Sequence, residues 1–232
     1  IQFNGNDEFR GNGGNDVFYM GAGNDTAFGG DGDDELHGGD GQDFLNGGSG
    51  NDRIFLDDFL GLESYANTAI GGQGDDFVEG GEGNDTIWAG AGDTGNDFLQ
   101  GQGGNDVIAG GAGDDRIDGG AGADTFVQSF RETGVDKITD FDPSEDTINL
   151  QGFGGIENVS RLSVTEVDGG TVISAGEGNT LLLEGVTPDQ LGVGNVTIDG
   201  EALSPGTSGS DLSSVIGDLT EVSDEASADI TL

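Results

Sequence analysis

Single apolar residues recur every nine positions along the first half of the chain, and polar residues or glycines separate them. Within residues 29–55, Leu36, Leu45 and Ile54 each stand two places after an aspartate. Aligned on that aspartate, twelve units take the form G-G-x-G-x-D-x-U-x, in which U is apolar. The x-U-x segment is a minimal β-strand whose middle side chain faces one side. The U residues are Phe9, Phe18, Ala27, Leu36, Leu45, Ile54, Val78, Ile87, Leu99, Ile108, Ile117 and Phe126.

A strand this short buries almost no surface alone, so the pattern is stable only when many units stack. Stacking aligns the U residues as one thin, continuous core, as in other repeat proteins. The glycines permit positive φ and therefore tight loops whose carbonyl groups point inward. The periodicity thus predicts an all-β solenoid over residues 1–127.

Each unit carries its aspartate at the same place, so stacking brings the carboxylates into columns along both edges. Carboxylates in a column repel one another unless a cation lies between them. Together with inward carbonyl groups they form an all-oxygen site, which favours calcium over zinc or copper. The column aspartates are Asp7, Asp16, Asp25, Asp34, Asp43, Asp52, Asp76, Asp85, Asp97, Asp106, Asp115 and Asp124.

The composition makes this cation a requirement for folding. The 232 residues include 49 glycines and 46 acidic residues against 6 Lys plus Arg, for a net charge of −40. Low hydrophobicity combined with such a charge normally produces disorder. So acidic a surface repels nucleic acid, and no apolar run approaches the roughly 18 residues of a membrane span. The chain has no cysteine, which excludes disulfides, thiolate metal sites and catalytic thiols.

The array over residues 2–127 resembles the RTX family of nonapeptide calcium-binding repeats found in secreted bacterial proteins. That resemblance implies a right-handed parallel β-roll with two repeats per turn. It also implies that Asp7 shares an ion with Asp25, that Asp16 shares one with Asp34, and that about eight to ten Ca²⁺ ions bind in all. A flexible acidic linker, the alternative for such a composition, would not keep a strict apolar column. The implied carbonyl ligands lie in the glycine-rich loops, at Gly14, Gly23, Gly32, Gly41, Gly50, Gly74, Gly83, Gly92, Gly104 and Gly113.

Two insertions interrupt the array. Residues 56–70 carry several apolar side chains, and we expect a loop or short helix that packs over the side of the roll; a contact for a partner is the alternative. Residues 93–95, Asp-Thr-Gly, expand one loop between Gly92 and Asn96. The ion of that loop is then displaced or differently coordinated, or Asp93 serves as an extra ligand.

Residues 128–203 are expected to form a β-rich capping region, because a terminal repeat must not present another open edge. The segment resembles the one that follows RTX arrays in serralysin-type proteins. Asp136, Asp140, Asp142 and Asp146 are candidate ligands for one further calcium ion, or else exposed turn carboxylates. Alternating residues predict a small antiparallel sheet with turns at Gly169-Gly170 and Gly178-Asn179, and residues 187–190 predict a short helical turn.

The tail, residues 204–232, is acidic, has no Lys or Arg, and ends Asp-Ile-Thr-Leu. This ending resembles the uncleaved C-terminal signals of type I secretion. Because Ile1 already lies within a repeat, we expect the chain to be the C-terminal part of a longer protein.

Catalytic motifs are missing from the sequence. We find no H-E-x-x-H, no P-loop and no Ser-His-Asp set at plausible spacing, so we predict no enzyme within these residues.

These features predict a calcium-binding module that folds on meeting extracellular calcium and supports type I secretion of a larger bacterial protein. Its partners would be calcium ions, the type I exporter during transit, and an upstream catalytic domain. The alternative is a structural surface protein, an S-layer, adhesin or filament, that self-assembles through calcium. In both cases the location is secreted, extracellular or on the surface of a Gram-negative bacterium.

Overall fold

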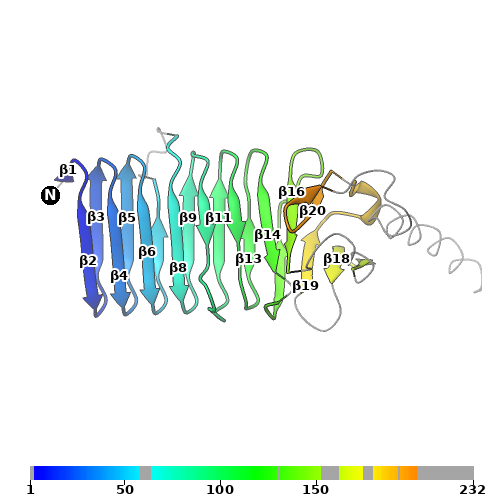
Figure 1. Cartoon of the computed structure of the whole chain (residues 1–232), viewed down its shortest axis with the longest axis horizontal. Helices are drawn as coiled ribbons and strands as arrows, with labels where there is room; N and C mark the ends of the chain where they lie inside the picture. Colours follow the sequence, from blue (N-terminus) through cyan, green and yellow to red (C-terminus); the bar gives the residue numbers. More distant parts are fainter. Residues whose placement is uncertain are drawn as a thin grey trace, which may run out of the picture.

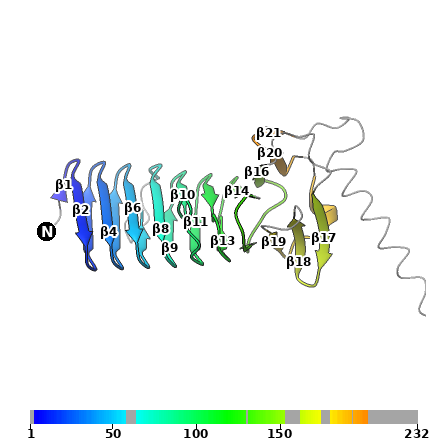
Figure 2. The same ribbon diagram turned by 60° about the horizontal axis from the view of Figure 1, so that its bottom comes forward.

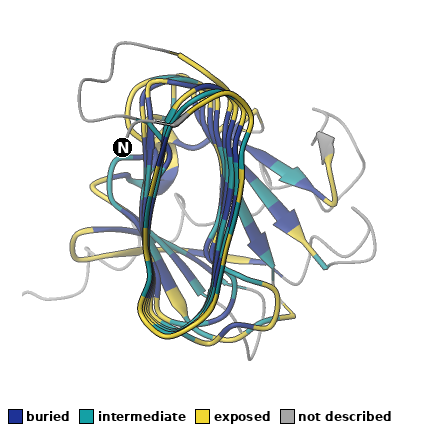
Figure 3. Ribbon diagram, turned by 90° about the vertical axis from the view of Figure 1, so that its left-hand side faces the viewer, coloured by how far each residue is buried: buried dark blue, intermediate teal, exposed yellow. Residues whose placement is uncertain are grey.

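The computed structural model describes residues 3–57, 64–129, 131–152, 162–174, 180–192 and 194–202. In these residues the chain winds as a flattened coil whose two broad walls are parallel β-sheets (Figures 1 and 3). Successive strands alternate between the two sheets, because each nonapeptide supplies one strand and one tight loop. The predicted all-β parallel β-roll is confirmed.

The first sheet holds the odd-numbered strands of the roll and ends in an antiparallel hairpin. In spatial order its strands are β1 (Phe3–Asn4), β3 (Val17–Ala22), β5 (Glu35–Asp40), β7 (Arg53–Phe55), β9 (Phe77–Gly81), β11 (Phe98–Gln102), β13 (Arg116–Asp118), β15 (Val135–Ile138), β19 (Thr180–Glu184), β18 (Gly170–Ser174) and β17 (Ser163–Val167).

The second sheet holds the even-numbered strands of the roll and faces the first. In spatial order its strands are β2 (Glu8–Gly13), β4 (Thr26–Asp31), β6 (Phe44–Ser49), β8 (Thr68–Gln73), β10 (Thr86–Trp88), β12 (Val107–Ala109), β14 (Thr125–Ser129), β16 (Thr147–Gln151), β20 (Val196–Ile198) and β21 (Glu201–Ala202).

The register places equivalent repeat positions over one another. Phe18 lies opposite Leu36, and Leu36 lies opposite Ile54, so one regular turn takes two nonapeptides. The U side chains from Ala27 to Ile108 have no exposed surface, whereas Phe9 at the open end is only partly buried. The core is therefore a single file of apolar side chains from each sheet.

The first insertion is shorter than predicted, because its last residues form a further repeat. Thr68 begins β8, which pairs in parallel with β6 and β10, and Ala69 lies opposite both Leu45 and Ile87. Ala69 is fully buried, as a U residue should be. The expected loop or helix falls mostly on residues 58–63, which lie outside the described residues.

The parallel ladder also continues past residue 127 into the capping region. Strand β15 pairs with β13, β16 with β14, and then β19 and β20 add one more parallel strand to each sheet. The antiparallel pairs β17–β18–β19 and β20–β21 end the two sheets (Figure 2). The cap is thus a continuation of both walls that finishes with antiparallel strands.

The local turns of the cap follow the sequence pattern. The turn between β17 and β18 lies at Asp168-Gly169, one residue before the predicted Gly169-Gly170, because Gly170 already pairs with Val167. Gly178-Asn179 and the tail from residue 203 lie outside the described residues. The 3-10 helix η2 (Pro188–Gln190) begins after Thr187, whose N–H donates to Gln190 Oε1 at 2.8 Å. In the described part of the chain, no helix has the length and apolar character needed to cross a membrane.

Candidate calcium sites

The repeat aspartates occupy the edges of the roll, each just before a strand begins. There the N–H of one aspartate donates to Oδ1 of the aspartate one turn further on, as between Asp16 and Asp34 at 2.8 Å. The carbonyl oxygen of Asp16 accepts the N–H of Glu35 at 2.9 Å. One carboxylate oxygen of each aspartate therefore fixes the loop of the preceding turn.

These hydrogen bonds arrange the aspartates in two columns, one along each edge of the roll. The pairs expected to share ions, Asp7 with Asp25 and Asp16 with Asp34, are successive members of a column. The first column runs through Asp7, Asp25, Asp43, Asn67, Asp85, Asp106, Asp124 and Asp146. The second runs through Asp16, Asp34, Asp52, Asp76, Asp97, Asp115 and Asp136.

The second carboxylate oxygen has no hydrogen-bond partner among the described residues, although it is buried. This holds for Asp93 in the expanded loop and for eleven repeat aspartates: Asp16, Asp25, Asp34, Asp43, Asp52, Asp76, Asp85, Asp97, Asp106, Asp115 and Asp124. A buried carboxylate oxygen without a donor is costly, so its presence at every turn needs a compensating charge.

The space in front of this oxygen is kept open by the first glycine of each G-G pair. A β-carbon on Gly29 would overlap Asp34 Oδ2 and also the carbonyl oxygen of Gly47 from the next turn. The same crowding occurs at Gly47, with Asp52 Oδ2 and the Gly71 carbonyl oxygen. A carboxylate oxygen and a backbone carbonyl oxygen thus converge on one point at Gly11, Gly29, Gly38, Gly47, Gly71, Gly80 and Gly101.

Burial of these groups changes their titration. Removal from solvent, together with the charge of neighbouring column aspartates, raises the pKa of Asp43 to about 7 and that of Asp106 to about 8. The hydrogen bond from the preceding aspartate lowers the pKa of each, but by less than burial raises it. Without a cation, the folded roll therefore resists ionisation of its own carboxyl groups.

The third glycine of each unit forms a stack of backbone segments beside the aspartates. A β-carbon on Gly41, whose φ is +133°, would overlap the carbonyl oxygen of Gly23. In the expanded loop the position in this stack belongs to Gly95 and not to Gly92. A β-carbon on Gly95 would overlap the Gly74 carbonyl oxygen, whereas one on Gly92 would have nothing within 4 Å. The alignment of Gly92 with the other loop glycines is therefore wrong.

The residue between this glycine and the aspartate adds a second side-chain ladder, which we did not predict. Asn24 N–H donates to Asn6 Oδ1 at 2.9 Å, and Asn51 N–H donates to Asp33 Oδ1 at 2.9 Å. The frequent asparagine at this position of the repeat was the available signal, because its short side chain bonds readily to nearby backbone.

Asn67 takes an aspartate position in the first column and was also missed. Its Oδ1 accepts the N–H of Asp43 at 2.8 Å, and its own N–H donates to Asp85 Oδ1 at 2.8 Å. Its Nδ2 donates to Asp57 Oδ1 at 2.9 Å, so Asp57 supplies the negative charge at this turn. The unit lacks the G-x-D letters, since Tyr65 replaces the glycine, and only the T-A-I-G-G sequence that follows resembles a repeat.

The columns end at two of the acidic residues of the capping region. Asp136 Oδ2 accepts from Gln128 Nε2 at 2.6 Å, and Asp146 Oδ2 accepts from Asp142 N–H at 2.8 Å. Protein donors thus occupy the oxygen that remains open in the regular repeats. Asp140 accepts from the N–H groups of Gly119 and Gly120.

The single further site expected for the four acidic residues of the capping region does not form. Asp136 ends one column and Asp146 ends the other, on opposite edges of the roll. Asp140 lies beyond the far end of β15 from Asp136. A calcium ligand role for Asp136 or Asp140 individually stays a prediction.

The residues at each regular turn fit a calcium ion. They offer carboxylate and carbonyl oxygens only, without nitrogen or sulfur, and Ca²⁺ prefers such hard ligands in a flexible arrangement. The open Oδ2 atoms and the glycine space in front of them lie where that ion would bind. An ion there would satisfy the unpartnered oxygens and neutralise the repulsion within each column.

Several solved structures are similar to this chain. The AlgE6R3 subunit of the Azotobacter vinelandii mannuronan C5-epimerase is 33% identical over 59% of this chain and 89% of its own, with a TM-score of 0.41. The AlgE6R2 subunit of that enzyme is 27% identical over 73% of this chain and 94% of its own, with a TM-score of 0.35. The extracellular lipase LipA of Serratia marcescens is 21% identical over 74% of this chain and 40% of its own, with a TM-score of 0.32.

None of the curated proteins compared with the chain matches it. The family model of the RTX calcium-binding nonapeptide repeat matches four segments, residues 4–27, 19–54, 63–94 and 92–126. The third segment contains Asn67 and so includes the repeat that we missed. The twelve repeat aspartates lie within these segments, whereas Asp136 and Asp146 follow the last one. The repeat region of this chain therefore belongs to the RTX calcium-binding nonapeptide repeats.

Proposed function

We propose that this chain is a folding and export module, which stays unfolded inside a Gram-negative bacterium and folds around calcium after type I secretion. The observation that carries the proposal is the row of buried Oδ2 atoms without donors along both edges of the roll. A roll with these oxygens ionised and no cation between them is unfavourable, so the cation decides whether the chain folds.

The calcium gradient across the cell envelope supplies the switch. Cytosolic calcium is far below the dissociation constants of roughly 10⁻⁴ to 10⁻³ M that extracellular modules show, and millimolar calcium outside exceeds them. Binding of about eight to ten ions would reduce the net charge from −40 to between about −24 and −20. Because only the folded state holds the ions, binding shifts the equilibrium toward folding.

The cargo would be a larger bacterial protein to which this chain belongs. An unfolded acidic chain can pass a narrow exporter, and its folding outside would give the exported protein a stable end. The tail from residue 204 supports this role by its composition, since it is acidic, free of Lys and Arg, and ends in a short apolar segment.

A secretion assay tests the proposal. The full chain and a variant that ends at residue 203 would be produced in a Gram-negative host that carries a type I exporter. We expect the full chain in the culture medium and the shortened variant inside the cells. Equal export of both would exclude the tail as the signal, and retention of both would exclude type I secretion by this host's exporter.

A further inference from the structure

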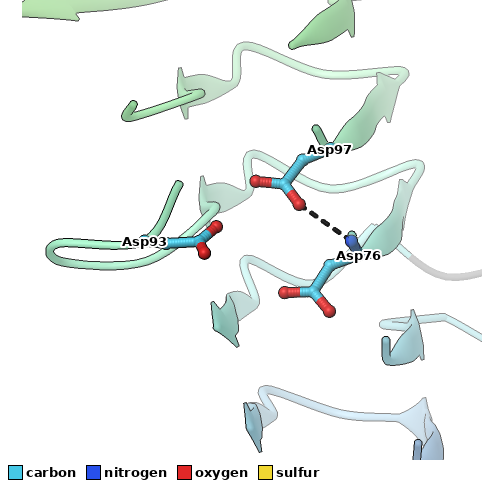
Figure 4. A group of neighbouring side chains, drawn as sticks. All are labelled: Asp76, Asp93 and Asp97. Carbon is cyan, nitrogen blue, oxygen red and sulfur yellow. Dashed lines mark hydrogen bonds between the residues drawn. The ribbon is translucent and has the colours of Figure 1, made fainter. Parts of the chain in front are cut away.

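The expanded loop between β10 and β11 brings a third carboxylate to one turn of the second column. Asp93 projects from this loop toward Asp76 and Asp97 (Figure 4). One carboxylate oxygen from each of the three lies within 4.8 Å of the other two, and all three side chains are buried. Asp93 is only 3% exposed, and its Oδ2 has no hydrogen-bond partner among the described residues.

The loop holds Asp93 in place through its other oxygen. Asp93 Oδ1 accepts the N–H groups of Thr94 at 2.7 Å, Gly95 at 3.0 Å and Gly74 at 3.2 Å. The column is undisturbed, since Asp97 Oδ1 still accepts the N–H of Asp76 at 2.8 Å. The insertion therefore adds a fixed carboxylate without breaking the hydrogen bond that continues the column.

The sequence of the insertion supports this interpretation. Without residues 93–95 the chain would read A-G-A-G-N-D-F-L-Q, which is a nonapeptide of regular length with alanine at the first glycine position. Three residues have thus been added within the loop itself, and one of them is an aspartate with a buried carboxylate close to those of Asp76 and Asp97. Among the described residues this is the one cluster of three potential ligands from separate side chains.

We propose that Asp76, Asp93 and Asp97 form a three-carboxylate site that holds its calcium ion more tightly than the two-carboxylate sites of the regular turns. The inference rests on the proposed calcium-dependent folding and adds to it a site that retains its ion longest. Affinity for calcium rises with the number of charged ligands and the rigidity of the site. Asp93 increases both, because it brings one more negative charge on a side chain already fixed by three N–H donors.

The position of the site gives the tight ion a structural role. The turn lies between β10 and β11, and the first insertion lies shortly before it, between β7 and β8. Repeat units are stabilised by their neighbours, so an ion held at this turn stabilises the turns on both sides. The last ion to leave would therefore keep the middle of the roll folded after the ends have opened.

The test measures release of calcium from the full chain after mixing with an excess of fluorescent chelator. In the unaltered chain we expect one ion per chain to leave at least about tenfold more slowly than the others, since tighter binding is expressed mainly in the dissociation rate. Asp93→Asn keeps the oxygen that accepts the three N–H groups but removes the charge, so the slow phase should disappear while the other ions leave as before.

Two further variants complete the test. Deletion of residues 93–95 restores a regular repeat and should also abolish the slow phase in a roll that folds normally. Asp168→Asn makes the same change of charge in the exposed turn between β17 and β18 and should leave the slow phase unchanged. Identical release from the unaltered chain and from both Asp93 variants would overturn the inference but not the proposed function. If the unaltered chain binds no calcium before it is mixed with the chelator, both the inference and the proposed function fail.

Discussion

At the scale of single residues, the two oxygens of each repeat aspartate have separate roles. Oδ1 accepts an N–H from the preceding turn and fixes the loop, whereas the buried Oδ2 stays open. An uncharged asparagine can take the first role, and Asn67 does so in the first column. The negative charge of an aspartate is therefore needed for the cation and not for the hydrogen bond.

Gly41→Ala tests how closely the loops stack. A β-carbon would overlap the Gly23 carbonyl oxygen, and φ of +133° is unfavourable for any residue with a β-carbon. Such strained conformations cost about 1–3 kcal/mol, so at saturating calcium we expect the melting temperature to fall by roughly 2–12 °C for a chain of this size. This fall in melting temperature is measured by thermal unfolding monitored by circular dichroism.

The matched control for this substitution is Gly194→Ala. Gly194 has nothing within 4 Å of its β-carbon position, and its φ is outside the left-handed region. The melting temperature of the Gly194→Ala variant should stay within about 2 °C of that of the unaltered chain, since exposed substitutions without such features change stability little. Equal effects of the two substitutions would show that the loops do not stack in this way.

At this scale, the sequence predicts only those positions at which the residue type is the same from repeat to repeat. The column aspartates, the U residues and most of the stacked glycines follow a strict period, so their places in the structure follow directly. Asn67 and Tyr65 were missed because neither letter matches the repeat, although their backbone continues the stack. Gly92 was assigned to the glycine stack in place of Gly95, because one glycine stands just before the insertion and the other is its last residue.

At the scale of elements, one turn of two strands is the unit of the roll. Each regular turn contributes two U residues to the core and one aspartate to each column, and it pairs only with the turns before and after it. Stability in such an array is close to a sum over units and their interfaces.

Deletion of residues 19–36 removes one such turn. Phe18 and Leu36 occupy equivalent positions, so the junction keeps the register of both sheets. We expect the shortened chain to fold at saturating calcium and to bind about two ions fewer, because one aspartate leaves each column. Equilibrium dialysis of the two chains compares the number of calcium ions that each binds.

A deletion of residues 19–35 is the control, since it differs by a single residue. It shifts the register by one position, which turns every following apolar side chain to the outside of its sheet unless a loop adjusts. This variant should therefore fold less completely than the longer deletion. Failure of the in-register deletion to fold would show that the turns are not independent units.

The capping elements were predictable in kind but not in position. The alternating pattern indicated the strands of the hairpin, which are present, and a turn at Gly169-Gly170, which the structure places one residue earlier. The continuation of the parallel ladder through β15 and β16 was missed. The G-x-D-x-U letters do recur before and in β15, as Gly134, Asp136 and Ile138, but no G-G pair precedes them, and the loop before β16 keeps only Asp146 of the pattern. The residues of these two strands also lie 21 and 22 positions from their partners, instead of the regular 18.

At the scale of the whole molecule, charge determines the conditions under which the roll can fold. The first column in particular buries Asp43 and Asp106, whose pKa values burial raises to about 7 and about 8 from the ordinary 3.8. The metal-free roll thus binds protons more tightly than the unfolded chain does. Its stability must then rise as the pH falls through this range and be lost as the pH rises through it.

Acidification in excess chelator should therefore favour folding. We expect the β-signal of the calcium-free chain to increase as the pH is lowered from 8 to 5, because protons replace the cation in neutralising the buried carboxyl groups. With saturating calcium, the signal at pH 8 should already be complete. A calcium-free spectrum that does not change between pH 8 and pH 5 would contradict the assigned burial of these aspartates.

The most direct test of the account is a calcium titration of the full chain at neutral pH, followed by far-ultraviolet circular dichroism, with magnesium as the control ion. The account predicts an unfolded spectrum in excess chelator and a cooperative transition to a β-rich spectrum near millimolar calcium. Magnesium should not replace calcium, since it prefers near-ideal octahedral geometry and gives up its water reluctantly. A β-rich spectrum that persists unchanged in excess chelator, or an equal response to magnesium, would contradict the claim that calcium drives this chain to fold.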